Sequence, residues 1–424
     1  MHSWTRRSLL AAVPALGLAP GAEAADDDPR DRVGARLSPW RRGTLDIHHL
    51  STGRGDATLI VGPDGTTILI DAGAASRIDA AALPARPSGE RRPGEWIARY
   101  IRRRLAETGG DRLDTLLVTH LHPDHMGGVG PDSPLEPGGL YRLTGVSDIA
   151  AAMPIGRIID PDFPDYGYPP FEDAASAQNY VAFVRAYAAQ GHRVERFCVG
   201  SGDQIRLDRG GVGRTFEVRN IASRGRVWTG HGDQTSEVFP SRPDLNPADF
   251  PGENASSAAI RLQFGAFRYF AAGDLTDWAH GGATPWLDAL TPAARAAGPV
   301  DVAVVPHHGL FDASGAAAIA ALAARVWVIL AWHASQPSPS TLERLLEPRL
   351  YAGARSIYST DLSPAQDLIA GRLATRLASR SGHVVLRVDD TGRSFRVVVT
   401  SAEDERDEVK AVSEPQVCRT PNGL

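Results

Sequence analysis

The chain has 424 residues, of which 42% are hydrophobic, 22% charged and 7% aromatic. This composition is typical of a globular protein and excludes the disordered, collagenous and small disulfide-rich classes. The formal net charge is -5 and Lys410 is the only lysine, so the totals do not predict a surface dedicated to polyanions. Cys198 and Cys418 are too few for a cysteine-based zinc site, although one disulfide between them stays open.

Residues 1–24 have the features of a signal peptide. A positively charged start containing Arg6 and Arg7 precedes an apolar run at 9–19 and a small-residue site that ends at Ala24. The paired arginines and the two leucines after them are typical of a twin-arginine signal; a general secretory signal is the alternative. We therefore expect a periplasmic or secreted protein, with a linker at residues 25–43.

Short apolar runs and helical periodicities predict a mixture of strands and helices, and leave the number of domains open. Runs bounded by glycine, proline and aspartate predict strands at 44–49, 57–61, 66–70, 115–118, 215–218, 258–264, 268–272, 302–305, 326–331, 384–388 and 394–399. Apolar spacings of three and four predict helices at 95–107, 174–190, 314–324 and 340–349. Residues 130–175 are expected to form a long irregular insertion, and 401–424 a charged, mobile tail.

The strongest chemical signal follows the strand at 115–118 directly. Four potential metal ligands lie within six residues: His120, His122, Asp124 and His125. Imidazole and carboxylate groups in this pattern suit zinc, manganese or iron. The alternative is a surface cluster in which Asp124 caps a helix, but that does not explain three histidines directly behind an apolar strand.

Two later strands also end in candidate ligands. Asp274 follows Gly273 at the end of the strand at 268–272, and His307 and His308 follow the strand at 302–305. Taken alone, a Gly-Asp pair is a common turn, and a histidine pair is more often structural than functional.

Residues 120–125 resemble the HxHxDH motif of the metallo-β-lactamase superfamily, and the two later strand ends are similar to its other ligand elements. The resemblance implies one domain over residues 44–400, an αββα sandwich with two mixed sheets face to face and helices outside. It also implies hydrolysis at a centre of two divalent metal ions, Zn²⁺ or Mn²⁺, with Asp274 as the bridging ligand. The full ligand set that we expect is His120, His122, Asp124, His125, Asp274 and His307. His308 would donate a hydrogen bond or proton to the substrate, although the two adjacent histidines can exchange these roles.

Within the superfamily, four segments resemble the metallohydrolase portion of the ComEC family of DNA-uptake proteins: residues 53–57, 69–73, 253–257 and 306–309. This resemblance implies that Asp56 and Asp71 orient metal-binding histidines, with simple turn-capping as the alternative. Ser51 and Arg54 replace an acid and a glutamine of the family's first loop.

Much of the superfamily has a third histidine at the first metal, and this chain offers only His192 and His231 in the relevant interval. His231 is the better candidate, and Asn254 is the alternative occupant of that corner. His333, which follows the strand at 326–331, is a further candidate proton donor, although a structural role is favoured.

The expected activity is hydrolysis of a phosphodiester or related ester by a metal-activated water. A lactone or β-lactam substrate, and a non-catalytic binding protein, remain alternatives. Phe163, Tyr166, Tyr168 and Phe171 could line the pocket. Arginines in and before the predicted helix at 95–107 either contact phosphates of a nucleic acid or form a solvated helix face; they are Arg86, Arg91, Arg92, Arg99, Arg102, Arg103 and Arg104.

Overall fold

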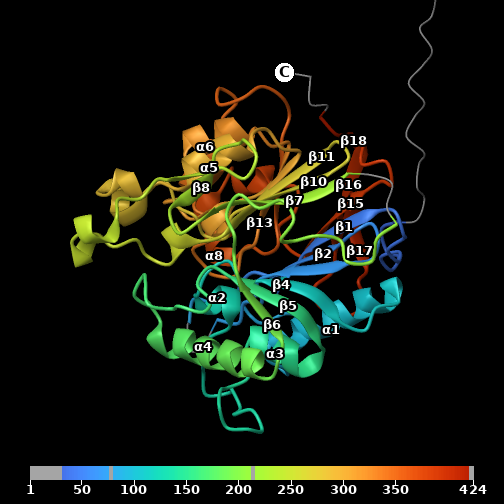
Figure 1. Cartoon of the computed structure of the whole chain (residues 1–424). Helices are drawn as coiled ribbons and strands as arrows, with labels where there is room; N and C mark the ends of the chain where they lie inside the picture. The colour runs from blue at the N-terminus through green and yellow to red at the C-terminus, as the bar shows by residue number, and fades with distance from the viewer. Residues whose placement is uncertain (1–30, 76–79, 212–214, 420–424) are drawn as a thin grey trace, which may run out of the picture.

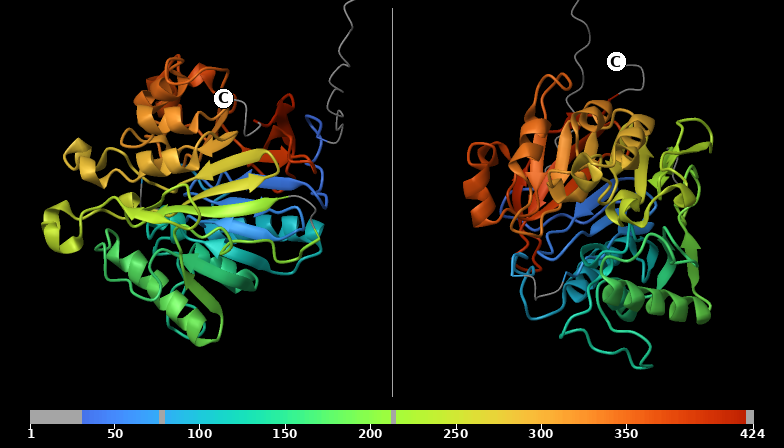
Figure 2. Two further views of the ribbon diagram at one scale, coloured as in Figure 1. Left: turned by 45° about the horizontal axis from the view of Figure 1, so that its top comes forward. Right: turned by 90° about the vertical axis from the view of Figure 1, so that its left-hand side faces the viewer.

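The computed structural model describes residues 31–75, 80–211 and 215–419, so the expected signal peptide lies outside the described residues. Two β-sheets pack face to face, and helices cover their outer faces (Figures 1 and 2). This arrangement confirms the predicted mixed α/β sandwich. None of the described helices has both the length and the apolar character that a membrane span requires.

The first sheet has ten strands in the order β17-β16-β15-β1-β2-β3-β4-β5-β6, with β18 paired to β16. Strands β3 to β6 run parallel to one another, whereas β1, β2 and β15 to β17 pair antiparallel. The strands are β1 Leu45–His49, β2 Thr58–Val61, β3 Thr67–Ile70, β4 Leu113–Leu117, β5 Ile155–Asp160, β6 Arg193–Arg196, β15 His383–Val388, β16 Ser394–Thr400, β17 Val409–Val412 and β18 Gln416–Val417.

The second sheet has eight strands in the order β14-β13-β12-β11-β10-β7-β8-β9. Strands β11 to β14 are parallel, so their carboxyl ends meet at one edge. The strands are β7 Phe216–Ser223, β8 Arg226–Trp228, β9 Thr235–Glu237, β10 Ala259–Phe264, β11 Phe267–Ala271, β12 Val302–Val304, β13 Val326–Ile329 and β14 Ser356–Ser359.

Each sheet buries one face against the other sheet and one against helices. Apolar side chains such as Ile47, Leu262 and Tyr269 fill the space between the sheets. Helices α1, α3 and α4 cover the first sheet, and α5 to α8 cover the second. The helices are α1 Pro93–Thr108, α2 Pro123–Met126, α3 Val146–Ala152, α4 Ala174–Ala189, α5 Leu290–Ala297, α6 Ala316–Leu322, α7 Pro339–Leu346 and α8 Pro364–Ala370. Short 3₁₀ turns are η1 Arg242–Asp244, η2 Pro247–Asp249, η3 Asn254–Ser256, η4 Ala279–Gly282, η5 Pro285–Leu287, η6 Pro306–Gly309 and η7 Ala374–Arg376.

Two segments are more regular than the sequence predicts. The expected irregular insertion at 130–175 contains α3 and β5, because Ile158 and Ile159 pair with β4 and become fully buried. The charged tail likewise forms β17 and β18 on the edge of the first sheet, so residues 401–419 pack on the domain. The polar composition of residues 401–419 does not predict these strands, because an edge strand buries only part of its surface and can be polar.

The arginines in and before α1 bind acidic side chains of the same chain. Arg99 and Arg103 pair with Glu405 at 2.5 and 2.6 Å, and the fully buried Arg104 pairs with Asp407 at 2.8 Å. Arg86 pairs with Asp361 and Arg92 with Asp148. The contacts to Glu405 and Asp407 fasten the tail to α1. Together, these ion pairs favour a structural role for the paired arginines over contacts to nucleic-acid phosphates.

Candidate metal centre

The candidate ligands meet where strands of the two sheets end. β4 ends at Leu117, and the chain turns through His120 before α2 begins at Pro123 with His122 as its N-cap residue. β11 delivers Asp274 from the second sheet, and β12 delivers His307 and His308 through η6. His120, His125, Asp274 and His308 are each at most 2% exposed, so the centre is protected from bulk solvent.

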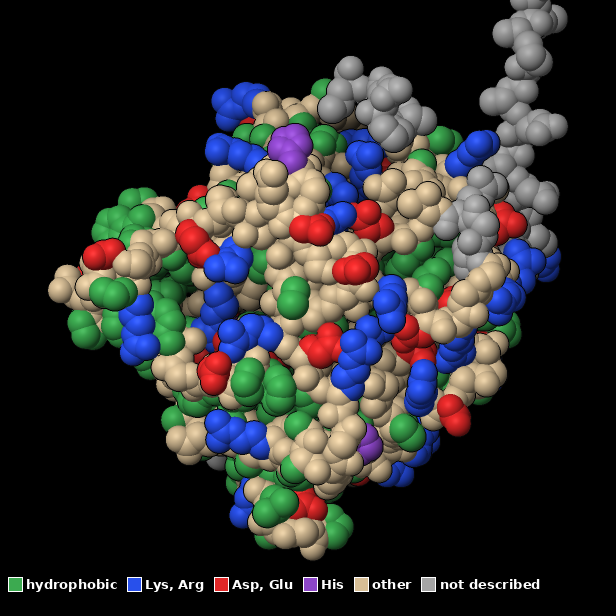
Figure 3. All heavy atoms as spheres, in the orientation of Figure 1, with side chains coloured by type: hydrophobic (Ala, Val, Ile, Leu, Met, Phe, Trp, Pro, Cys, Tyr) green, Lys and Arg blue, Asp and Glu red, His purple; other side chains and the backbone are tan. Residues whose placement is uncertain are grey.

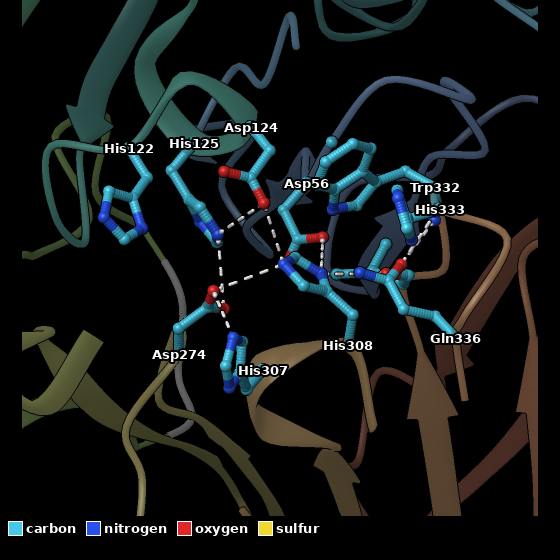
Figure 4. Close-up of polar contacts among 12 residues, drawn as sticks. Asp56, His122, Asp124, His125, Asp274, His307, His308, Trp332, His333 and Gln336 are labelled. Atoms are coloured by element: carbon cyan, nitrogen blue, oxygen red, sulfur yellow. Dashed lines mark hydrogen bonds and ion pairs between the residues drawn. The ribbon is translucent and has the colours of Figure 1, made fainter. Parts of the chain in front are cut away.

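One group of side chains surrounds His125 and His308 (Figure 4). The Nε2 atoms of both histidines lie 3.2 Å from oxygens of Asp274, on Oδ1 and Oδ2 respectively. Asp124 Oδ2 lies 3.0 Å from His308 Nε2 and 3.6 Å from His125 Nε2. Ligand atoms of His125, Asp274, His308 and Asp56 all lie within 4.8 Å of one another, as binding to one ion requires.

A second group shares Asp274 with the first and adds His120 and His122. His120 Nε2 lies 3.1 Å from His122 Nδ1 and 3.8 Å from Asp274 Oδ2. Two nitrogens bound to one tetrahedral zinc ion at about 2.0–2.1 Å would lie roughly 3.3 Å apart. The pair is therefore spaced for a common ion, and Asp274 stands between the two candidate positions.

Unsatisfied buried atoms show that the residues fit metal ions. Within the described part of the chain, His125 Nε2, His308 Nε2 and Asp274 Oδ1 are buried and have no hydrogen-bond partner. Leaving such atoms unpaired costs about 1–3 kcal/mol each, and divalent cations would satisfy all three. The donor set of imidazoles and carboxylates suits Zn²⁺ or Mn²⁺.

The electrostatics of the centre also favour a cation. Burial opposes a charge on His125, yet the carboxylates of Asp274, Asp124 and Asp71 raise its pKa well above the ordinary value. Burial likewise opposes ionisation of Asp274, but His125, His308 and His307 hold its pKa well below the usual range. The carboxylates that favour a proton on His125 also favour a metal ion there, because protons and metal ions compete for the same nitrogens.

Asp71 and Asp56 lie behind the ligand histidines. His125 Nδ1 donates to Asp71 Oδ2 at 2.8 Å, and Asp71 is itself fixed by the backbone N–H of Thr119 at 2.7 Å. His308 Nδ1 lies 3.0 Å from Asp56 Oδ1 and 3.0 Å from the carbonyl oxygen of Leu330. Asp71 binds the far nitrogen of His125, and the Leu330 carbonyl oxygen binds that of His308, so both near nitrogens turn toward the centre, as is usual for metal-binding histidines.

The two adjacent histidines have different surroundings. Both have left-handed backbone conformations, with φ of 52° at His307 and 53° at His308, which is strained for residues with a Cβ. This turn sends His308 into the ligand group. His307 lies outside both groups: its Nδ1 contacts Asp312 at 2.7 Å, and its Nε2 contacts Asn254 at 3.1 Å and lies 3.9 Å from Asp274 Oδ2. The structure therefore places His308, rather than the preferred His307, among the candidate ligands.

The remaining candidate histidines lie apart from both groups. His231 is exposed in the turn before β9, and His192 is exposed and stacks on Tyr187 with ring centroids 4.0 Å apart. His333 bonds Ser335 at 2.8 Å and packs edge-on against Trp332. Of the three residues considered as a further ligand of the first metal, His192, His231 and Asn254, only Asn254 reaches the site, through its contact with His307.

Glu172, which was not predicted from the sequence, reaches the centre from the loop that precedes α4. Its Oε2 lies 3.3 Å from His122 Nε2, on the side of the ring opposite the atom that faces His120. Glu172 therefore contacts the far nitrogen of His122, as Asp71 contacts the far nitrogen of His125. A lone glutamate in an irregular loop carries no spacing signal, so only the folded chain shows this contact.

Two glycines allow the loops of the centre to interlock. The backbone N–H of Asp56 donates to the carbonyl oxygen of Asp124 at 2.8 Å, and Gly73 donates to the carbonyl oxygen of Asp56 at 2.8 Å. A Cβ at Gly73 would lie 2.0 Å from that Asp124 oxygen, and a Cβ at Gly55 would lie 2.2 Å from it. Any side chain at these positions must push the metal-binding loop away.

Gly73→Ala is expected to lower the stability of the protein by about 1–3 kcal/mol, as overpacking usually does, and to reduce its metal content. Chemical denaturation and metal analysis of the purified protein would measure both effects. Gly167→Ala is the matched control, because a Cβ there would meet no heavy atom within 4 Å. Unchanged metal content and stability in Gly73→Ala would contradict the tight packing of these loops.

The fold and the site together define a two-sheet α/β protein with a candidate centre for two metal ions at its strand ends. Residues 50–131 match the family model described as the metallo-β-lactamase superfamily. The matched segment contains Asp56, Asp71 and the whole of residues 120–125, and so supplies four of the six candidate ligands.

The solved structures that match the chain do so with low sequence identity and low TM-scores. A CmlA β-hydroxylase variant is 16% identical with a TM-score of 0.36; the match covers 83% of this chain and 55% of that one, so the chain spans about half its length. A diphosphatase from the PhnP family is 13% identical with a TM-score of 0.31, covering 81% and 96% of the two chains. Human tRNase Z, short form, is 13% identical with a TM-score of 0.29, covering 66% and 91%. The search of curated proteins gave no match.

Proposed function

We propose that the protein is a metal-dependent hydrolase that cleaves phosphodiesters at the centre built around Asp274. The observation that carries the proposal is the pair of ligand groups sharing this one carboxylate. Two divalent ions held there, Zn²⁺ or Mn²⁺, would supply an acidified water and neutralise the negative charge that develops on the substrate. Two-metal centres cleave carboxylic derivatives as well as phosphoesters, and the resemblance of residues 53–57, 69–73 and 306–309 to the ComEC family supports the phosphodiester.

The residues of the chain divide the remaining work. His120 and His122 would hold one ion, Asp124, His125 and His308 the other, and Asp274 both. Asp71, Asp56 and Glu172 keep the imidazoles turned toward the centre. His307 lies beside the centre with its Nδ1 bonded to Asp312 and its Nε2 3.1 Å from the amide nitrogen of Asn254, so Nε2 can donate a hydrogen bond or a proton to the leaving oxygen when the ring is protonated.

The motifs at residues 53–57, 69–73 and 306–309 support a relation to the metallohydrolase portion of the ComEC family. Export through a twin-arginine signal at residues 1–24 is part of the same proposal and rests on the sequence of that segment. The pairing of the α1 arginines with the tail argues for a small phosphodiester rather than for long nucleic acids as the substrate.

Metal analysis and a substrate comparison on the purified protein would test the proposed function. We expect about two equivalents of metal and hydrolysis of bis(4-nitrophenyl) phosphate, with much slower turnover of a chromogenic β-lactam and of a simple lactone. His120→Ala should remove the phosphodiesterase activity. Hydrolysis of the β-lactam or lactone alone would assign the protein to the carboxylic-derivative class. Less than one equivalent of metal, with activity unchanged in His120→Ala, would exclude metal-dependent catalysis.

A further inference from the structure

Two large aromatic side chains are exposed in the loops that follow the ligands Asp274 and His308. Trp278 is 48% exposed and Phe311 is 52% exposed, and their rings meet edge to face with centroids 5.8 Å apart. Trp278 lies four residues after Asp274, and Phe311 lies three residues after His308. Single exposed apolar residues are common, whereas this pair is in contact and is carried by the two loops that supply Asp274 and His308.

Backbone contacts hold this pair beside His307. The carbonyl oxygen of Asp312 accepts hydrogen bonds from the backbone N–H groups of Asp277 and Trp278 at 3.2 and 3.1 Å. The carboxylate of the same Asp312 bonds His307 Nδ1 at 2.7 Å. One residue therefore connects the backbone that carries both rings to the imidazole that faces the centre.

The two rings are also supported from behind. A Cβ on Gly282 would lie 2.0 Å from Trp278 Nε1, so the indole rests directly on the backbone of η4. Arg344 donates to the carbonyl oxygens of Phe311 and Ala313 at 3.1 and 2.9 Å and so holds the loop that follows His308. The η4–η5 segment projects at the left of Figure 1, and hydrophobic side chains lie on it in Figure 3.

We propose that Trp278 and Phe311 bind an aromatic ring of the substrate, so that the hydrolase selects phosphodiesters that carry such a ring. This inference rests on the proposed function, because the ester must lie at the centre for its substituent to reach the pair. The centre attracts the anionic phosphate, and the aromatic pair offers the ring an apolar surface just beyond His307 and Asp312. Stacking on aromatic side chains is sufficient to favour one ligand over another by about tenfold.

Binding of two non-hydrolysable phosphonates to the metal-loaded full chain would test this inference. By isothermal titration calorimetry, phenylphosphonate should bind about tenfold more tightly than methylphosphonate. Trp278→Ala and Phe311→Ala should each remove most of this preference while leaving the affinity for methylphosphonate and the metal content unchanged. Leu368→Ala, which truncates a side chain that is 84% exposed in α8, is the control and should keep the preference.

Several outcomes would overturn the inference. They are equal affinity for the two phosphonates, absence of binding by either, and a preference that survives both aromatic substitutions. A change from a dimer to a monomer in Trp278→Ala, seen by sedimentation, would make the pair a protein interface instead. Failure of the proposed function is distinguishable: a preference for phenylphosphonate without cleavage of bis(4-nitrophenyl) phosphate would refute hydrolysis and leave the aromatic site standing. Cleavage without the preference would refute the aromatic site alone.

Discussion

Asp274→Asn is expected to lower kcat/KM for a phosphodiester by about 10³-fold or more and to remove most of the bound metal. Asp274 is the one residue that both ligand groups share, and its two oxygens face His125 Nε2 and His308 Nε2 at 3.2 Å. An asparagine keeps the size of the side chain but loses the negative charge and one acceptor oxygen. Steady-state kinetics together with elemental analysis of the purified variant would measure both losses.

The same substitution should leave the fold intact, because asparagine fills the same volume at the end of β11. Far-ultraviolet circular dichroism should therefore match the wild type. Asp165→Asn changes a carboxylate whose side chain is 84% exposed, and as the control it should keep full activity and metal content. Wild-type turnover by Asp274→Asn, or retention of two equivalents of metal, would rule out a bridging role for this residue.

His308→Ala and His307→Ala should fail in different ways. His308→Ala is expected to lose about one equivalent of metal and about 10³-fold in kcat/KM, because His308 Nε2 lies within 3.2 Å of both Asp124 and Asp274. His307→Ala should keep both equivalents and lose about 10²-fold in kcat, since it removes a proton or hydrogen-bond donor and no ligand. Metal analysis and kinetics of the two variants side by side would measure the difference.

Glu172→Gln is a useful companion to this pair, since it keeps the contact to His122 and removes the charge. Glu172→Gln should reduce metal affinity modestly: less than His308→Ala, which loses a ligand, and more than His307→Ala, which loses none. If His307→Ala instead lost the metal and His308→Ala kept it, the ligand assignment would return to the one preferred from sequence.

The local part of the site could be predicted because its residues are close along the chain. His120, His122, Asp124 and His125 follow the end of one buried strand, so the turn alone brings them together. Asp274 and the histidine pair became candidates only through the resemblance of their strand ends to the superfamily's other ligand elements. The apolar runs and amphipathic periodicities predicted a mixture of strands and helices, and the family resemblance implied their arrangement as a two-sheet sandwich.

Contacts between segments that are far apart in the chain could not be predicted from local spacing. The arginines of α1 have the same pattern whether they face solvent, a phosphate or the acids of the tail, and only the folded chain brings Glu405 and Asp407 to them. Likewise β5 and the tail strands depend on β4 and β16 for their pairing; the isoleucines of β5 stand in a segment rich in proline, glycine and aspartate, and the tail is charged.

The sequence by itself determined the kind of chemistry: an acidic, nearly lysine-free chain with a histidine-rich strand end that suits metal ions. Tertiary structure decided how the residues divide the work. It turned His308 rather than His307 into the ligand group, put Asp71, Asp56 and Glu172 behind the imidazoles, and set Trp278 against Phe311 at the rim. The physical reason is that spacing along the chain fixes neighbours within a turn, whereas the direction of a side chain at a strained backbone and its distant partners depend on packing between the sheets.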